Sequence, residues 1–206
     1  MTPIFCESCG KAILSAADPC PHCGFLPLPP PEPPALDPYF PLFPVSTTKF
    51  VVMSTFTFSF YYLYWIYANW SRISYTQGIA LSPFWRMFFS GIWNFSLFGQ
   101  IRDLAWDRQI EVGWNPILFA ILTLIGSLLG RADGALGLVA TLTFLLAIPI
   151  NQTAQKINAH HAHTVSEPRN DKFSGWNITI IVLGGIIWAL TLLGNTLELL
   201  RDTSLN

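Results

Sequence analysis

Four long stretches without a charged residue constrain this chain more than any other feature. They hold 22, 19, 22 and 25 residues, and they lie between Lys49 and Arg72, between Glu111 and Arg131, between Asp133 and Lys156, and between Lys172 and Glu198. A helix of about 20 apolar residues matches the roughly 30 Å hydrocarbon layer of a bilayer. These stretches therefore predict helices that cross a membrane.

The composition of the 206-residue chain points the same way. Hydrophobic residues make up 51%, aromatic residues 15% and charged residues 11%, whereas about 25% of residues are charged in soluble proteins. The formal net charge of −1 gives no basic excess that would attract nucleic acid. The composition thus excludes a largely disordered chain and predicts the lipid bilayer as a partner.

The predicted spans are not equally clear. Ile178–Leu197 is the clearest, because it holds eleven Ile, Leu or Val residues and no charge. Phe50–Ala68 runs into tyrosines and tryptophans that are typical of a membrane–water interface. Phe84–Ile101 is marginal because Arg86 lies near its start, so a span and an interfacial or re-entrant helix both stay open.

Residues 115–130 and 134–150 predict a tight hairpin whose arms are short for a bilayer, with a re-entrant pair as the alternative. Small residues at near-helical spacing favour a close approach of the two backbones. They are Gly126, Gly130, Gly134 and Gly137.

The fold class expected for residues 47–206 is therefore an all-α integral membrane bundle of four to five transmembrane helices. With five spans, seven Lys or Arg residues lie on the side of the N-terminus and four on the other. The positive-inside rule then predicts a multi-pass protein of the cell (inner) membrane with a cytoplasmic N-terminus.

All four cysteines lie within the first 23 residues, in two C-x-x-C-G pairs. The first pair is Cys6 and Cys9, the second is Cys20 and Cys23, and ten residues separate the pairs. Four thiolates around Zn²⁺ form a closed tetrahedral shell, which is typical of structural sites. Residues 1–25 are therefore predicted to be a zinc ribbon that folds around one structural Zn²⁺.

Disulfide, redox and mixed cysteine–histidine sites are the alternatives for these cysteines. No basic or apolar leader precedes Cys6, so we expect a reducing cytoplasmic location rather than a secreted disulfide framework. A redox C-x-x-C pair would need a βαβ context. His22 within the second pair could replace one cysteine as a ligand.

The predicted ribbon is anionic, because its one lysine, Lys11, is outnumbered by the acidic residues Glu7 and Asp18. The thiolates add further negative charge. The ribbon therefore predicts no nucleic-acid partner but an unknown protein partner, or zinc sensing; a purely stabilising role is the alternative. Residues 26–46 are predicted to be a linker, because nine prolines between Pro27 and Pro44 favour polyproline II.

The remaining polar residues give weaker hypotheses. His160, His161 and His163 near Glu167 and Asp171 could form a second metal site or a pH-responsive patch, or simply a solvated helix end. The sequence lacks a catalytic constellation, so a non-enzymatic protein is expected. A small transporter or channel regulated by the ribbon is the alternative, and a homo-oligomer is left open. The polar residues that would line a transport route are sparse: Arg86, Asn94, Gln100 and Asn195.

The segment Tyr64-Trp65-Ile66-Tyr67-Ala68-Asn69-Trp70, followed by Ser82-Pro83-Phe84-Trp85-Arg86-Met87-Phe88, resembles a group of uncharacterised bacterial multi-span membrane proteins. In that group a YW-x-Y-x-x-W segment precedes a P-x-x-R-x-x-F segment, and some members carry an N-terminal zinc ribbon. The later stretches 155–158 and 176–188 are similar to it as well. The resemblance implies a bacterial membrane protein and carries no activity.

Overall fold

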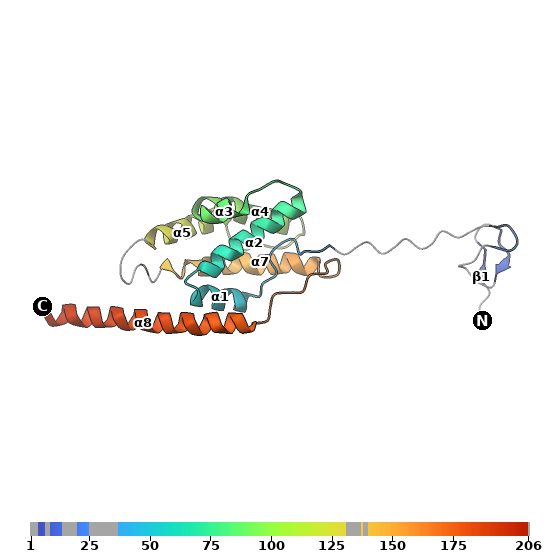
Figure 1. Cartoon of the computed structure of the whole chain (residues 1–206). Coiled ribbons are helices and arrows are strands. Elements are labelled where there is room, and N and C mark those ends of the chain that lie inside the picture. The colour runs from blue at the N-terminus through green and yellow to red at the C-terminus, as the bar shows by residue number, and fades with distance from the viewer. Residues whose placement is uncertain are drawn as a thin grey trace. The chain divides into compact units, whose positions relative to one another are not determined.

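The computed structural model describes residues 4–6, 9–13, 20–24, 37–130, 137 and 140–205 (Figure 1). The chain divides into two compact units, Met1–Ala35 and Leu36–Asn206. In the smaller unit, strand β1 (Ile4–Phe5) pairs antiparallel with β2 (Ala12–Ile13). The described elements of the larger unit are helices.

The helices of the larger unit follow one another along the chain (Figure 1). They are α1 (Thr47–Phe56), α2 (Phe60–Gln77), α3 (Pro83–Phe88), α4 (Ser90–Trp106), α5 (Pro116–Leu129), the 3-10 helix η1 (Thr143–Ala147), α7 (Ile148–His160) and α8 (Gly175–Leu205). Polar capping residues and prolines mark where some of these helices begin. The Ser46 hydroxyl accepts the Lys49 N–H before α1, and the Asn115 side chain accepts the N–H groups of Ile117 and Leu118 before α5.

Aromatic and aliphatic side chains of α2 occupy the centre of the helical unit. Trp65, Ile66 and Trp70 are fully buried and belong to one hydrophobic cluster with Phe50 of α1 and Phe98 of α4. Removing a side chain of this size from water contributes about 1.5–3 kcal/mol. The core is therefore built inside the protein, and helix–helix packing rather than lipid covers these residues.

Buried asparagines bind the extended segment 37–45 into this core. Asn158 of α7 makes two hydrogen bonds to the Leu42 backbone, at 3.1 and 2.9 Å, and Asn69 of α2 accepts the Phe43 N–H at 3.1 Å. Asn151 accepts the Trp65 indole N–H at 2.9 Å. Each carboxamide satisfies a backbone or indole group that burial would otherwise leave unpaired.

The loop between α7 and α8 is fastened to the same segment by charged side chains. Glu167 binds both terminal nitrogens of Arg72 at 2.6 Å and accepts the Phe40 N–H at 3.1 Å. The buried Lys49 ammonium donates to the Asn170 side chain and to the Lys172 carbonyl, each at 2.6 Å. Burial lowers the pKa of Lys49, and the nearby Asp171 carboxylate opposes that shift.

The predicted bundle of four to five transmembrane helices is wrong. Among the described residues, one helix is long and apolar enough to cross a membrane by length and composition: Gly175–Leu197 within α8. The predicted span Phe50–Ala68 is broken where Phe58 and Ser59 adopt left-handed conformations, with φ of 51° and 69°. Two helices, α1 and α2, therefore replace one continuous span.

The other predicted spans are also shorter than a bilayer. Phe84–Ile101 divides into α3 and α4 at Phe89, and the 14 residues of α5 extend about 21 Å. Residues 140–150 form a turn, η1 and the start of α7; the rest of the predicted stretch 134–150, apart from Gly137, lies outside the described residues. The close glycine contact expected there is made by Gly126, where an added Cβ would collide with Thr143 of η1.

Helix α8 contacts the rest of the unit mainly through α1. A Cβ at Gly184 would collide with the carbonyl of Phe56, so the two backbones touch at this point. One turn farther, the Trp188 indole donates to the Thr55 carbonyl at 2.8 Å and stacks on Phe58, with ring centroids 4.9 Å apart. Beyond this contact the large apolar side chains of α8, such as Leu190 and Leu197, are exposed.

Candidate metal centre

The two C-x-x-C-G pairs fold into similar turns in the small unit. In each turn the glycine N–H donates to the carbonyl of the first cysteine, Gly10 to Cys6 at 2.9 Å and Gly24 to Cys20 at 2.8 Å. Both glycines have positive φ, 68° and 70°, which residues with a Cβ rarely adopt. The glycine after each pair therefore has the conformational role that its position predicts.

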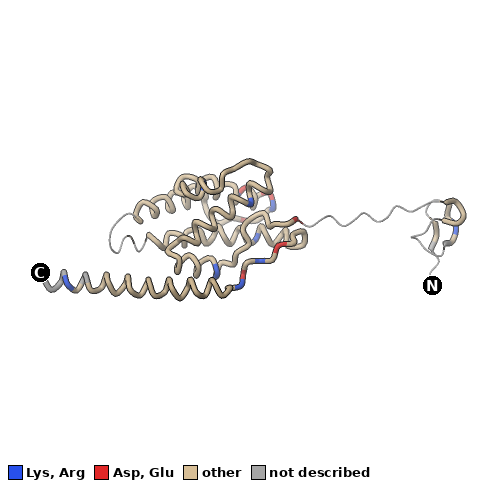
Figure 2. Tube along the Cα trace, viewed as in Figure 1, with Lys and Arg blue, Asp and Glu red and all other residues tan. Residues whose placement is uncertain are grey.

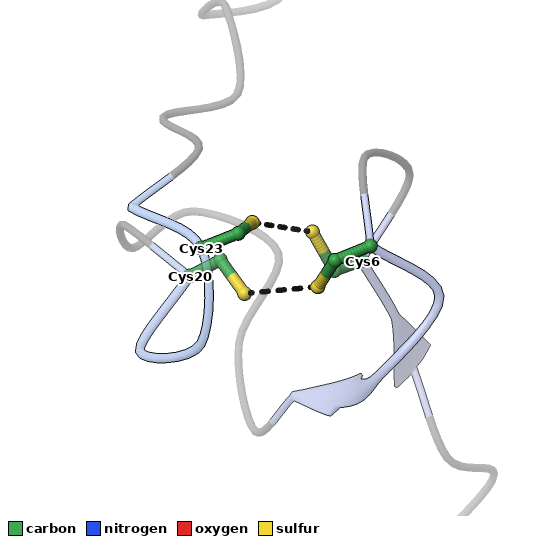
Figure 3. Close-up of side chains that lie close together, drawn as sticks. Cys6, Cys20 and Cys23 are labelled. Atoms are coloured by element: carbon green, nitrogen blue, oxygen red, sulfur yellow. Dashed lines mark hydrogen bonds between the residues drawn. The ribbon is translucent and has the colours of Figure 1, made fainter.

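These turns bring four sulfur atoms together. The Sγ atoms of Cys6 and Cys23 lie 3.7 Å apart, as do those of Cys9 and Cys20, and all four lie within 4.8 Å of one another. Figure 3 shows Cys20 and Cys23 facing Cys6 across the space between the two turns. The four cysteines are free thiols, so the structure does not contain the disulfides weighed as an alternative.

The sulfur spacing suits a metal ion at the centre of the group. Zn–S bonds of about 2.3 Å place the corners of a tetrahedron about 3.8 Å apart, which is close to the two separations of 3.7 Å. Soft thiolate ligands in this arrangement bind zinc or iron. The four cysteines can therefore hold one metal ion.

Hydrogen bonds to the sulfur atoms divide the four thiols electrostatically. The backbone N–H of His22, helped by that of Cys23, lowers the pKa of Cys20 to about 6. For Cys9 the backbone N–H of Lys11 acts in the same direction, but desolvation and the hydrogen bonds with the three other cysteines raise its pKa to about 11. Without a cation Cys20 thus favours the thiolate and Cys9 the thiol, and metal binding would release the Cys9 proton.

The histidines of the second hypothetical metal site are not gathered with acidic groups. Within the described part of the chain, the four cysteines are the group whose ligand atoms converge. The Nε2 atom of His161 accepts from Arg108 at 2.9 and 3.1 Å, whereas His160 and His163 are exposed. Glu167 binds Arg72 instead.

The four polar residues that would line a transport route each contact other groups of the helical unit. The Arg86 guanidinium lies between two indole rings, 4.2 Å from the centroid of Trp70 and 4.1 Å from that of Trp93. Asn94 donates to the Tyr62 and Thr123 hydroxyls, Gln100 donates to Ser96, and Asn195 bonds to the Thr191 carbonyl of its own helix. The structure does not bring these four side chains together.

The contacts that hold the loop before α8 were not predictable from the sequence alone. Arg72 and Glu167 are 95 residues apart, and Lys49 and Asn170 are 121 residues apart. A single sequence holds no local signal for such pairs. The asparagines at 69, 151 and 158 were visible as polar residues in apolar surroundings, which is the pattern that a buried hydrogen-bonding group leaves.

The chain matches none of the family models, curated proteins and solved structures with which it was compared. The resemblance to uncharacterised bacterial membrane proteins therefore stays a prediction, and the four-cysteine group is the feature with the most defined chemistry.

Proposed function

We propose that this chain is a non-enzymatic membrane-anchored protein whose zinc-bound head docks a protein partner on the cytoplasmic side of the cell membrane. The head comprises residues 1–25, and α8 is the anchor. The observation that carries the proposal is the convergence of four cysteine sulfurs within 4.8 Å. A head of about 25 residues has too small a core to fold unaided, so a metal would supply most of its folding free energy.

Zinc is the metal that we propose. A tetrahedral shell of four thiolates leaves no open position for water or substrate, which is the arrangement of a structural rather than a catalytic ion. Reversible zinc sensing would require the ion to exchange readily, and a closed shell that also folds the head opposes exchange. Docking is therefore the use that this arrangement supports better.

The surface of the head supports a protein partner. Phe5 of β1 is 60% exposed, and aromatic side chains of this kind are frequent anchors of protein interfaces. Lys11 is exposed and precedes Ala12, which pairs with Phe5 between the two strands. By composition, residues 1–25 hold Glu7 and Asp18 against this one lysine, and the thiolates add further negative charge. Negative charge opposes phosphate binding, which supports a protein over a nucleic acid.

Helix α8 supports the membrane part of the proposal. Its residues Gly175–Leu197 carry no charge and extend about 34 Å, enough to cross a hydrocarbon layer of about 30 Å. Only 6% of its most apolar stretch is buried within the protein. A helix of this composition is stabilised when lipid covers it.

The metal is tested by elemental analysis of the purified full chain. We expect about one zinc per chain in the native protein, a loss of most of it in Cys6→Ser or Cys20→Ser, and no loss in the matched head variant Lys11→Ala. Retention of full zinc by both cysteine variants would overturn the zinc-bound head. A cross-linked partner that is lost in Phe5→Ala and in Cys6→Ser would identify the docking surface.

The anchor is tested by extraction of membranes at alkaline pH. We expect the native chain to stay in the pellet, and Val182→Lys combined with Ile186→Lys to weaken its retention, because each lysine costs about 2.5–3.5 kcal/mol near the centre of a spanning helix. The matched control places the same lysines at Thr76 and Gln77, at the exposed end of α2. Quantitative release of the native chain would contradict the proposal.

A further inference from the structure

The helical unit has a second large apolar surface, formed by α3, α4 and α5. On α3 and the start of α4 it consists of aromatic and aliphatic side chains that are 49–68% exposed: Phe84, Trp85, Phe88, Phe89 and Ile92. Monomeric soluble proteins rarely expose contiguous apolar patches beyond a few hundred Å². We name this surface, with its continuation on α5, the α3–α5 face.

Helix α5 continues the face with aliphatic side chains. Ile117, Leu118, Ile125 and Leu128 are 47–61% exposed, and no residue of α5 is charged. Helices α4 and α5 pack against each other. Gly91 of α4 lies against Leu124 of α5, and Asn94 of α4 donates to the Thr123 hydroxyl of α5. The exposed residues of α4 and α5 therefore flank one helix–helix interface.

The only charged residue between Ile73 and Ile101 is Arg86, which lies in α3 among the exposed aromatic residues and is itself partly exposed. Its guanidinium contacts two indole rings, 4.2 Å from the centroid of Trp70 and 4.1 Å from that of Trp93. Cation–π contacts of this type become stronger when water is excluded. The two contacts therefore lower the cost of placing this charge beside hydrocarbon.

The charges of the helical unit are also distributed unevenly. In the view of Figure 1, α5 and α8 both run toward the left and end there. Figure 2 shows most Lys, Arg, Asp and Glu residues of the unit at the opposite end, while the tube of α5 and the middle of α8 carry none. The charge-free parts of both helices therefore extend in the same direction from the charged end.

We propose that the α3–α5 face is embedded in the hydrocarbon and interfacial layers of the same membrane that α8 crosses. This inference rests on the membrane anchor proposed above. Phe, Leu and Ile favour the hydrocarbon interior and tryptophan favours the interface, so the exposed side chains of both α3 and α5 suit contact with lipid. With a length of about 21 Å, α5 enters the layer without crossing it.

Tryptophan quenching by brominated phosphatidylcholine tests the proposal on the full chain in vesicles. Trp85 belongs to the face and is 55% exposed, whereas Trp106 is 79% exposed at the charged end of α4. We expect Trp85→Phe to reduce the amount of fluorescence that the brominated lipid quenches and Trp106→Phe to leave that amount unchanged. Equal effects of the two variants would overturn the inference.

A second variant changes the α3–α5 face and leaves Trp85, the fluorescent residue, in place. Ile121 and Ile125 of α5 are exposed, so Ile121→Lys combined with Ile125→Lys should fold and keep its helical circular dichroism. We expect it to remain in vesicles through α8 but to lose the quenching that depends on Trp85. Unchanged quenching of Trp85 in this variant would overturn the inference. It would also be overturned if Trp85 of the native chain were not quenched and the α3–α5 face were covered in a detergent-stable dimer.

The two proposals fail differently. If the native chain does not associate with vesicles at all, the membrane anchor fails, and the embedded face fails with it. If the native chain stays bound and the lysine variant of α8 is released completely, the membrane anchor holds. If brominated lipid does not quench Trp85 in that bound native chain, only the embedded face is overturned.

Discussion

The pair formed by Arg72 and Glu167 fastens the loop before α8 to the end of α2. The side chains of the pair are only 13% and 19% exposed, and Glu167 also accepts the Phe40 N–H. Hydrogen bonds between charged groups with little access to water contribute more than surface ion pairs do. These two residues therefore stabilise segment 37–45 and the loop together.

Replacing Glu167 should destabilise the helical unit. We expect Glu167→Ala to lower the free energy of unfolding by about 1.5–3 kcal/mol, because it leaves the Phe40 N–H without its acceptor and the Arg72 guanidinium with only the Phe40 carbonyl, at 3.2 Å. Urea unfolding followed by circular dichroism measures this change. Arg169→Ala is the matched control, since the Arg169–Asp171 pair is 3.6 Å long and half-exposed; an equal loss in both variants would contradict the expectation.

His161 should make stability depend on pH. Desolvation and the Arg108 guanidinium lower the pKa of His161 below its usual 6.5, and Asp37 opposes this only in part. The unfolded chain therefore binds a proton more readily than the folded chain. The free energy of unfolding should be highest above pH 6.5 and should fall as the pH drops below it. Denaturant midpoints at pH 5.5 and 7.5 should differ less in His161→Gln than in native protein or in the exposed control His163→Gln; an unchanged difference would exclude His161 as the source.

At the scale of the elements, α8 approaches α1 most closely at Gly184, which has no side chain. Gly184 lets α8 touch the Phe56 carbonyl, whereas Gly194 has open space around the position of a Cβ. Valine costs the same helix propensity at either position. The two glycines therefore form a matched pair for measuring the contact.

We expect Gly184→Val to lower the free energy of unfolding by about 1–3 kcal/mol relative to Gly194→Val, because an inserted side chain forces α8 away from α1. The same variant should shift the fluorescence of Trp188, whose indole stacks on Phe58 and donates to Thr55. Equal stabilities and equal spectra of the two variants would show that α8 does not pack on α1 through Gly184.

The sequence predicted some of these elements well. The predicted arm 115–130 contains α5, and the predicted span Ile178–Leu197 lies within α8. It did not predict the break after α1, since neither glycine nor proline stands at Phe58 or Ser59. The one hint was local: Thr55 and Thr57 donate to the carbonyls four residues earlier, a bond that competes with regular helix.

The gathering of the four cysteines was predictable to the residue because they lie close together in the sequence. Two short turns, each closed by a glycine, place four sulfurs without the help of distant residues. The helical core is different, because charge-free stretches are equally compatible with lipid contact and with burial inside a protein. Only tertiary contacts such as those of Asn69 and Asn158 decide which stretches are covered by protein.

At the scale of the whole molecule, the head and the helical unit have separate sources of stability. The helical unit, Leu36–Asn206, has a large hydrophobic core, whereas we propose that the small unit, Met1–Ala35, folds around a metal held by its four cysteines. We expect a strong zinc chelator to expose the head to limited proteolysis and to make its thiols reactive. The helical circular dichroism signal and melting temperature of the larger unit should stay unchanged. Cooperative loss of helix on chelation would contradict this separation.

The hydrogen bond from Trp188 to the Thr55 carbonyl has a consequence for biosynthesis. The two residues are 133 positions apart, so a ribosome completes α1 and α2 long before it synthesises α8. At 5–20 residues per second the delay is on the order of 10 s. During that interval the Thr55 carbonyl and the Phe58 ring lack their α8 partners, so the contact between α1 and α8 forms only after α8 has left the ribosome.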